Sequence, residues 1–246
     1  MKIIGLIPAR MQSSRFPGKP LVNIEGLPMV IHVLKRAQLC KDLSEVFVAT
    51  DSHLIFDCVL EHGGKALMTS LEHKTGTDRI AQACENLDCD IVINIQGDEP
   101  LVNPEDISKL TACVRADPEI HFATLVCKTR QFREITECKV VMDRNHDIMY
   151  MSRSDIPSNA RAAIDHMFKL YCVVAFQKPW LKKFAVWEQT ELEKLEYIEY
   201  LRILENGYKM RGVIIEEYST SVDTPHDLSV ILEMMKKDTL KHKYLK

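Results

Sequence analysis

Short apolar runs alternate with amphipathic segments over the first half of the chain. Buried strands are predicted over the apolar runs 2–8, 45–50, 65–69 and 90–96. Helical spacing of apolar side chains is found over residues 28–40, 53–63, 77–87 and 104–116, and Thr77 is the predicted N-cap of the third helix. Strands that alternate with helices form parallel sheets with both faces covered. The pattern therefore predicts an α/β fold with a doubly wound, mostly parallel sheet.

The pattern changes after residue 120. Strand-like segments follow one another without intervening helices over residues 120–129, 138–143, 148–154 and 168–176. A single amphipathic helix ending at Gly207 is then predicted over 191–207, followed by a strand at 208–218 and a last helix at 224–237. We expect one domain over 1–246, with a smaller strand-rich extension at about 120–176 that is either a lobe or a dimerisation element.

Composition narrows the class of protein. The 32 basic and 35 acidic residues give a net charge of −3, which argues against a general nucleic-acid-binding surface. Eight scattered cysteines form no CxxC pair, and no HExxH motif occurs, so a zinc site is not expected. We interpret these thiols as small buried hydrophobes of a reducing compartment. The first apolar run is too short for a signal sequence and no later segment is long enough to span a bilayer, so a cytoplasmic protein without membrane contact is expected.

A loop rich in cations and small residues follows the first predicted strand. It runs from Pro8 to Lys19 and carries Arg10, Arg15 and Lys19 together with the hydroxyls of Ser13 and Ser14. No Walker A motif is present, because Gly18–Lys19 is followed by Pro20 and not by Ser or Thr. No GxGxxG fingerprint occurs in the loop either. Backbone amides, hydroxyls and fixed cations nevertheless suit a phosphate. The alternative is an ordinary solvated basic loop.

Two further polar stretches follow predicted strands, where ligands bind in open α/β sheets. The stretch HKTGTDR (73–79) offers backbone amides at a helix N-terminus, with Arg79 in reach of a base or phosphate; the alternative is a capped helix with a surface arginine. The stretch QGDEP (96–100) places Asp98 and Glu99 at a strand end, which suits Mg²⁺ or simply a turn. Asp223 in SVDTPHDL either supplies a second carboxylate or caps a helix.

Together these motifs resemble one enzyme family. The segments IPAR-x-x-S-S-R-F-P-G-K-P-L, TGTDR, QGDEP, SRSDIP, LENG and VDTP occur in the order and spacing of the CMP-Kdo synthetases, the 3-deoxy-manno-octulosonate cytidylyltransferases, including relatives that activate the 8-amino analogue. The resemblance extends from about residue 2 to 235. It implies a nucleotide-diphospho-sugar transferase-like fold and a homodimer. The implied reaction couples CTP to a 2-keto-3-deoxy sugar acid, giving a CMP-sugar and pyrophosphate for lipopolysaccharide or capsule synthesis.

The resemblance also implies residue roles. The residues expected to be catalytic are Arg10, Lys19, Asp98 and Asp223, of which Asp98 and Asp223 would hold Mg²⁺. The residues expected around the nucleotide are Pro8, Ala9, Arg10, Ser13, Ser14, Lys19, Thr75, Gly76, Arg79 and Gln96. The residues expected on the side of the sugar acid are Arg15, Glu99, Arg153, Leu170, Tyr171, Glu199 and Tyr200.

The sugar-acid positions depart from the family pattern. Leu170 stands where the family has a histidine, Cys172 replaces a glycine and Tyr200 replaces a glutamine. Because unmatched polar groups are costly, such changes alter which hydroxyls a site accepts. The accepted substrate is then a variant ulosonic acid, another α-keto acid or a phosphonate. Alternatively, the hydroxyls of Tyr171 and Tyr200 preserve the ordinary specificity.

Two functions of other classes remain open on the sequence. The first is a catalytically silent nucleotide-binding module that regulates a pathway; it would tolerate loss of Asp98 or Asp223, and both residues are present. The second is a nucleotidyltransferase that uses UTP or GTP. Such enzymes carry a glycine-rich opening after the first strand, where this chain has PARMQSSRFPGKP.

Overall fold

The computed structural model describes residues 1–12, 15–216 and 220–245, apart from the side chain of Cys172. The chain divides into two compact units. The first comprises Met1–Ser108 and Ser219–Lys246, and the second comprises Lys109–Tyr218. The expectation of one domain with an extension over about 120–176 stays a prediction.

Four parallel strands form the sheet of the first unit. They are β1 (Ile3–Ala9), β4 (Glu45–Thr50), β5 (Lys65–Met68) and β6 (Ile91–Ile95). β1 pairs with β4 on one side and with β6 on the other, and β4 pairs with β5. Every residue of β1 and β6 is buried, as expected for strands covered on both faces. This part of the chain confirms the predicted mostly parallel α/β fold.

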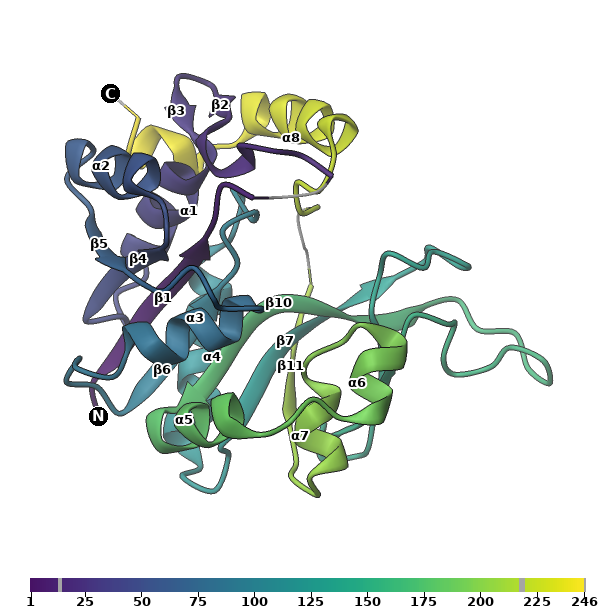
Figure 1. The fold of residues 1–246 in the computed structure, drawn as a ribbon. Coiled ribbons are helices and arrows are strands. Elements are labelled where there is room, and N and C mark those ends of the chain that lie inside the picture. Colours follow the sequence, from purple (N-terminus) through teal and green to yellow (C-terminus); the bar gives the residue numbers. More distant parts are fainter. Residues whose placement is uncertain (13–14, 217–219, 246) are drawn as a thin grey trace. The chain divides into compact units, whose positions relative to one another are not determined.

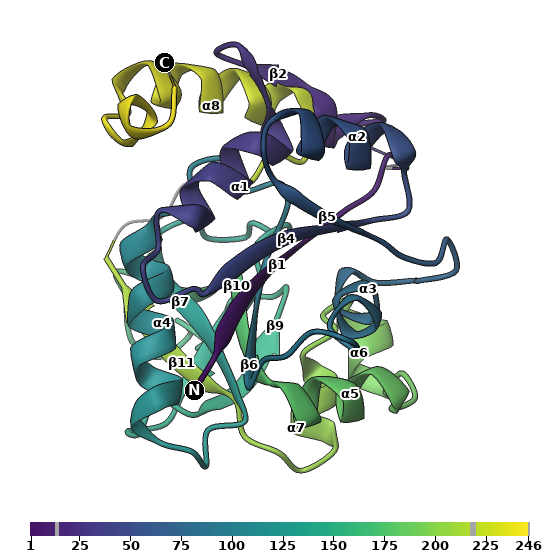
Figure 2. The same cartoon turned by 90° about the vertical axis from the view of Figure 1, so that its left-hand side faces the viewer.

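Helices cover both faces of this sheet. The connections contain α1 (Met29–Gln38), α2 (His53–Glu61) and α3 (Gly76–Ala83). Figures 1 and 2 show α1 and α2 on one face and α3 on the other. This follows from right-handed crossovers, because the chain steps from β1 to β4 to β5 and then returns across β1 to β6. The reversal makes the carboxyl ends of β1 and β6 the expected binding crevice.

The C-terminal segment belongs to the first unit. It contains α8 (Pro225–Lys237) and the short 3-10 helix η2 (Leu240–Lys243), and it lies beside α1 and the hairpin of β2 (Asn23–Ile24) and β3 (Leu27–Pro28) (Figure 1). Ile231 and Met235 of α8 are fully buried in one cluster with Ile24, Met29 and Val222. Residues far apart in the sequence therefore share this small core.

A buried arginine fixes the end of this segment. Arg36 is 1% exposed; its Nε donates to the Tyr244 hydroxyl (3.2 Å) and its guanidinium pairs with Asp238. The Tyr244 hydroxyl also lies 3.0 Å from Nδ1 of His32, whose Nε2 lies 2.7 Å from the carbonyl oxygen of Ile24. With Nε2 protonated, each donor in this network meets an acceptor.

The second unit contains the strand-rich segment that was predicted. Its strands are β7 (Phe122–Thr129), β8 (Lys139–Met142), β9 (Ile148–Ser152), β10 (Met167–Gln177) and β11 (Arg211–Ile215). β10 pairs antiparallel with β7 and β8, β8 with β9, and β11 runs parallel to β7. The helices here are α5 (Lys178–Val186), α6 (Glu191–Glu196) and α7 (Leu201–Glu205), while α4 (Pro104–Ala116) crosses the boundary between the units in the sequence.

Two sequence predictions of local structure need correction, and one helix was missed. The single helix over 191–207 is two helices, because Tyr197 takes a left-handed backbone (φ 55°) that ends α6. The cap of α3 is Thr75, whose Oγ1 accepts from the N–H of Asp78, whereas Thr77 lies inside the helix. Helix α5 was not predicted at all.

The structure bears on two expectations from composition: that the cysteines are buried thiols, and that no segment spans a membrane. Among the cysteines whose side chains the structure describes, seven are free thiols, of which four are buried and three are half-buried. No helix within the described residues is long and apolar enough to cross a membrane.

Candidate functional site

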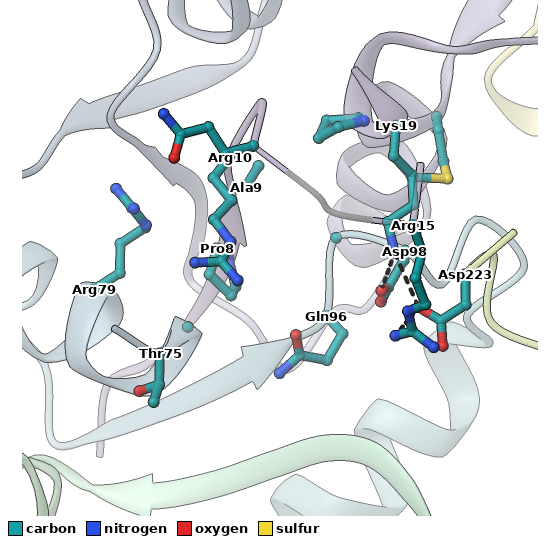
Figure 3. A pocket seen from close by; sticks show the side chains of 15 residues that line it. Pro8, Ala9, Arg10, Arg15, Lys19, Thr75, Arg79, Gln96, Asp98 and Asp223 are labelled. Atoms are coloured by element: carbon teal, nitrogen blue, oxygen red, sulfur yellow. Dashed lines mark hydrogen bonds and ion pairs between the residues drawn. The ribbon is translucent and has the colours of Figure 1, made fainter. Parts of the chain in front are cut away.

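A pocket opens at the carboxyl ends of β1 and β6, where the sheet reverses (Figure 3). Most of the predicted nucleotide residues line it. The predicted residues in its wall are Pro8, Ala9, Arg10, Arg15, Lys19, Thr75, Gly76, Arg79, Gln96, Asp98 and Asp223. The sequence interpretation missed Gln12, Pro20 and Met29 as further wall residues. For Gln12 and Pro20, the position inside or directly after the cationic loop was the available signal, whereas Met29 is the first residue of α1 and no motif marked it.

One lysine joins the two aspartates that the sequence proposed as a pair. The Nζ atom of Lys19 lies 2.7 Å from Oδ2 of Asp98 and 3.3 Å from Oδ1 of Asp223 (Figure 3). Arg15 adds a second cation, with Nη2 3.0 Å from the same oxygen of Asp223. The Lys19 side chain is 13% exposed, so the pairing is partly shielded from solvent. The fold thus gathers cations and carboxylates from three distant segments.

Local structure explains how Lys19 reaches this position. Gly18 adopts a left-handed backbone (φ 72°), and the 3-10 helix η1 (Lys19–Leu21) begins directly after it. The N–H of Gly18 donates to the carbonyl of Met11 (3.1 Å), which closes the loop on itself. A glycine fits here because a side chain at positive φ is strained. Ser13 and Ser14, the two predicted hydroxyls of this loop, lie outside the described residues.

Asp223 reaches the site through the C-terminal segment. The N–H of Val222 donates to the carbonyl oxygen of Asp98 (3.0 Å), and the Val222 side chain is fully buried. Thr224, not Asp223, caps α8 through a capping box with Asp227. The helix-cap interpretation of Asp223 is therefore wrong, and its role as a second carboxylate for a metal stays a prediction.

Glycines allow the walls of the pocket to approach closely. A Cβ atom at Gly97 would lie 2.8 Å from the carbonyl oxygen of Pro8, and one at Gly76 would lie 3.1 Å from the Pro8 ring. The first contact is with backbone, which cannot easily yield. Gly97 therefore permits the ends of β1 and β6 to meet at the floor of the site.

The structure contradicts the surface interpretation of Arg79, while its contact with a base or phosphate stays a prediction. It lines the pocket, yet it is 2% exposed and pairs with Asp51 (Nη2 to Oδ2, 2.6 Å). It is therefore not a surface arginine, and Asp51 is a partner that the sequence analysis missed. The position of Asp51 directly after a predicted strand was the signal that could have found it.

The carboxylate pair fits a divalent cation by its chemistry. Asp98 and Asp223 both contact one ammonium, so their oxygens already converge on a single cation. Mg²⁺ prefers such oxygen ligands and commonly uses one or two carboxylates together with substrate phosphates. Within residues 1–12, 15–216 and 220–245, no group of three or more His, Cys, Asp and Glu side chains is arranged to hold a metal.

The residues predicted for the sugar acid have different locations. Arg15 lines the pocket, whereas Glu99 is buried (4% exposed) and does not belong to its wall. The remaining predicted residues belong to the second unit and are Arg153, Leu170, Tyr171, Glu199 and Tyr200. Of these, Leu170, Tyr171 and Tyr200 are buried.

The Arg153 guanidinium is already engaged by the backbone. It donates to the carbonyl oxygens of Glu196 (3.2 Å), Thr136 (2.5 Å) and Tyr197 (3.2 Å). The Arg153 N–H binds the Glu196 carboxylate (2.8 Å). These contacts fix the side chain within the second unit and leave its predicted contact with a sugar acid untested.

The sequence of this chain is similar to those of known enzymes. Residues 4–217 match the cytidylyltransferase family. The 3-deoxy-manno-octulosonate cytidylyltransferase of Syntrophus aciditrophicus (strain SB) is 41% identical over 242 residues, covering 95% of this chain and 97% of the relative. The 8-amino-3,8-dideoxy-manno-octulosonate cytidylyltransferase of Shewanella halifaxensis (strain HAW-EB4) is 41% identical over 237 residues, covering 94% and 97%.

A solved structure is similar over nearly the whole chain. It is that of a CMP:2-keto-3-deoxy-manno-octonic acid synthetase complexed with CTP. It superposes with a TM-score of 0.93 at 36% sequence identity, covering 96% of this chain and 99% of that chain.

Proposed function

The chain belongs to the cytidylyltransferase family, and we propose that it couples CTP to a 3-deoxy-2-ulosonic acid, Kdo or a Kdo-like sugar. A hydroxyl oxygen of the acid attacks the α-phosphorus of CTP, the bond from this phosphorus to the β-phosphate oxygen breaks, and pyrophosphate leaves. The hydroxyl proton passes to solvent. The observation that carries the proposal is the convergence of Lys19, Asp98 and Asp223 in one pocket at the reversal of the sheet.

The cations of the pocket offset the negative charge of the substrates. Both substrates are anionic, so their approach is repelled until the charge is cancelled. Arg10, Arg15 and Lys19 line the pocket and supply fixed positive charge for the triphosphate. Such preorganised groups are worth most where phosphate charge develops during transfer.

We further propose that Asp98 and Asp223 hold Mg²⁺ beside the triphosphate. When bound, the ion would neutralise phosphate charge and make the attacking hydroxyl more acidic. Lys19, which contacts both carboxylates here, is then available to contact a phosphate oxygen. A thermal-shift titration with CTP, with and without Mg²⁺, tests this step. A CTP-induced rise in Tm that is the same in EDTA as in Mg²⁺ would contradict it.

The identity of the acid is a separate question. Relatives named for Kdo and for its 8-amino analogue are equally similar to this chain, so overall identity does not distinguish them. Leu170 and Tyr200, which depart from the family pattern, are 9% and 3% exposed. The Tyr200 ring lies 6.4 Å from that of Phe176, measured between centroids. This burial favours a packing role for Tyr200 over a hydroxyl that replaces the family's polar contact with the sugar acid. A variant ulosonic acid is therefore the second candidate substrate.

Pyrophosphate release tests the function directly. The protein is incubated with CTP, Mg²⁺ and one acid at a time: Kdo, 8-amino-Kdo, other ulosonic acids, and a phosphonate. Release that requires both CTP and an ulosonic acid supports the proposal. Efficient use of Kdo would remove the variant-substrate candidate, and release with UTP or GTP at the rate of CTP would contradict the nucleotide assignment.

Three further expectations accompany this proposal: a homodimer formed through the strand-rich segment, a cytoplasmic location, and a role in lipopolysaccharide or capsule synthesis. Exposed apolar side chains on that segment, among them Ile135 (71% exposed) and Met149 (66%), support a covered surface there. Light scattering of the purified protein tests the dimer, because a monomer at micromolar concentration would contradict it.

A further inference from the structure

Arg79 is a buried cation in the wall of the pocket. Its Nη2 lies 2.6 Å from Oδ2 of Asp51, and its Nη1 lies 2.5 Å from Oγ1 of Thr69 and 3.4 Å from the carbonyl oxygen of Ser70. A charge with 2% exposure is tolerated only when it is paired and hydrogen-bonded. Asp51 supplies the opposite charge, and Thr69 and Ser70 occupy the other guanidinium nitrogen.

The partners of Arg79 come from neighbouring strand ends. Asp51 directly follows β4, Thr69 directly follows β5, and Arg79 lies in the first turns of α3. The N–H of Thr69 donates to the carbonyl oxygen of Thr50 (2.9 Å), so the two strand ends are joined beyond their last paired residues. The guanidinium is therefore held by residues that directly follow two paired strands, where the backbone is anchored to the sheet.

The two ends of the pocket carry different side chains. Lys19, Arg15, Asp98 and Asp223 gather at one end, and Thr75 and Arg79 lie at the other, with Gln96 between them (Figure 3). A triphosphate and its cation belong at the first end. The nucleoside of the same molecule then extends toward the end at Arg79, where the guanidinium can only donate hydrogen bonds.

We propose that Asp51 is a positioning residue for nucleobase recognition: with Thr69, it fixes the Arg79 guanidinium so that its donors meet an acceptor edge of the base. This inference rests on the proposed use of CTP. A fixed donor favours cytosine, whose N3 accepts a hydrogen bond, over uracil, whose N3 carries a hydrogen. Precise orientation is what creates this discrimination, because a mobile guanidinium can turn to either base.

Asp51→Asn removes the charge while keeping the shape of the side chain. The Arg79 charge then lacks its buried partner and is free to turn toward other acceptors, including the phosphates. We expect the KM for CTP to rise about tenfold with kcat changed less than about threefold, because a binding contact and not a reacting group is lost. The ratio of kcat/KM for CTP over UTP should fall by a similar factor.

A matched control lies at the opposite end of the same strand pair. Glu45 at the start of β4 pairs with Lys65 at the start of β5 (2.6 Å), on the surface and outside the pocket wall. Glu45→Gln removes a carboxylate charge from the same strand and should leave both nucleotide constants unchanged. Asp51→Glu keeps the charge and should recover part of the CTP preference.

A double-mutant cycle tests whether Asp51 acts through Arg79. In an Arg79→Met background, adding Asp51→Asn should change the KM for CTP less than about twofold. A tenfold effect in that background, or an unchanged KM and CTP/UTP ratio in Asp51→Asn alone, would overturn the proposal. The Tm of each variant is measured. If Asp51→Asn is poorly folded, Asp51→Glu decides the case: a CTP/UTP ratio between those of the wild type and Arg79→Met supports the proposal, and a ratio equal to that of the wild type overturns it.

Nucleotide binding without turnover separates this inference from the proposed function. Thermal shifts with CTP and with UTP, both with Mg²⁺ and without any acid, report base preference directly. If no acid supports pyrophosphate release but CTP still raises the Tm more than UTP does, the proposed reaction fails while Asp51 remains testable. Loss of that preference in Asp51→Asn, but not in Glu45→Gln, supports the positioning role; its retention overturns it.

Discussion

The backbone N–H of Val222 donates a hydrogen bond to the carbonyl oxygen of Asp98 at 3.0 Å. This bond joins two segments that are far apart in the sequence. Asp98 carries one carboxylate of the pocket, and Val222 directly precedes Asp223, which carries the other. The side chains of Asp98 and Asp223 then meet at one ammonium, that of Lys19. The geometry of the site therefore depends on backbone pairing as much as on side chains.

Removal of the Lys19 ammonium should impair turnover strongly. In Lys19→Ala, the two carboxylates lose their shared cation and the triphosphate loses a preorganised contact. We expect kcat/KM for pyrophosphate release to fall by about two to three orders of magnitude, and Asp98→Asn to have a similar effect. Lys65→Ala, which removes an exposed lysine outside the pocket wall, is the control. Near-normal turnover of Lys19→Ala or Asp98→Asn, with an unchanged circular dichroism spectrum, would refute the assignment of the residue that was changed.

The contact between Gly97 and Pro8 predicts a graded response to added methyl groups. A Cβ at Gly97 meets the Pro8 carbonyl oxygen at 2.8 Å, whereas at Gly76 it meets the more adaptable proline ring at 3.1 Å. Gly97→Ala should lower the free energy of unfolding by about 1–3 kcal/mol. Gly76→Ala should cost less, and chemical denaturation measures both. Equal stability of Gly97→Ala and the wild type would show that the floor of the pocket can open.

His32 predicts how stability depends on pH. Burial lowers the pKa of His32 below 6.5, and the nearby Arg36 charge lowers it further, although the hydrogen bond to Ile24 and the charges of Asp238 and Glu25 oppose this. The unfolded state therefore binds a proton at a higher pH than the folded state does. The contribution of His32 to stability is complete above pH 6.5 and is lost as the pH falls from 6.5 toward the lowered folded pKa.

A pH series of thermal unfolding measures this dependence. The Tm of the wild type should fall as the pH decreases below about 6.5. His32→Gln, which can keep a donor toward the Ile24 carbonyl but does not titrate, should show a shallower fall. A steeper or identical fall in the variant would exclude His32 as the source. Tyr244→Phe, which removes the partner of Nδ1, should lower the Tm at every pH.

The half-buried thiols should react slowly in the native protein. Burial raises the pKa of the Cys138 thiol to about 12, and it also raises the pKa values of Cys58 and Cys113 above 9.0. Because only the thiolate reacts, alkylation by iodoacetamide at pH 8 should be at least about tenfold slower than in urea. Peptide mass spectrometry measures each site. Rapid labelling of Cys138 in the folded protein would contradict the burial of its sulfur.

Periodicity predicted the elements of the first unit well, because its strands are buried on both faces and its helices are amphipathic. The segment 104–116 was predicted with the bounds of α4, where Pro104 marks the start. The break between α6 and α7 was missed for a physical reason. Ile198 and Leu201 are both buried, so the apolar spacing continues across Tyr197 even though its backbone turns left-handed.

The site shows the same division between local and long-range information. Lys19 and Asp98 were predicted because each follows a strand in a recognisable motif. The contact of Arg79 with Asp51 was not predicted, because it depends on helix α3 lying beside the end of β4. Such a contact follows from the arrangement of strands and helices in the fold, which the pattern of a single segment does not reveal.

The last part of the chain has a consequence for biosynthesis. Asp223, the buried core residues of α8 and the Arg36 partners Asp238 and Tyr244 all lie after residue 220, yet they complete the unit that begins at Met1. During translation, β1 and the cationic loop are synthesised before Asp223, which follows Lys19 by 204 positions. A ribosome that stops between these two residues releases a chain in which Lys19 lacks at least one of its two carboxylate partners and the core around α8 cannot form.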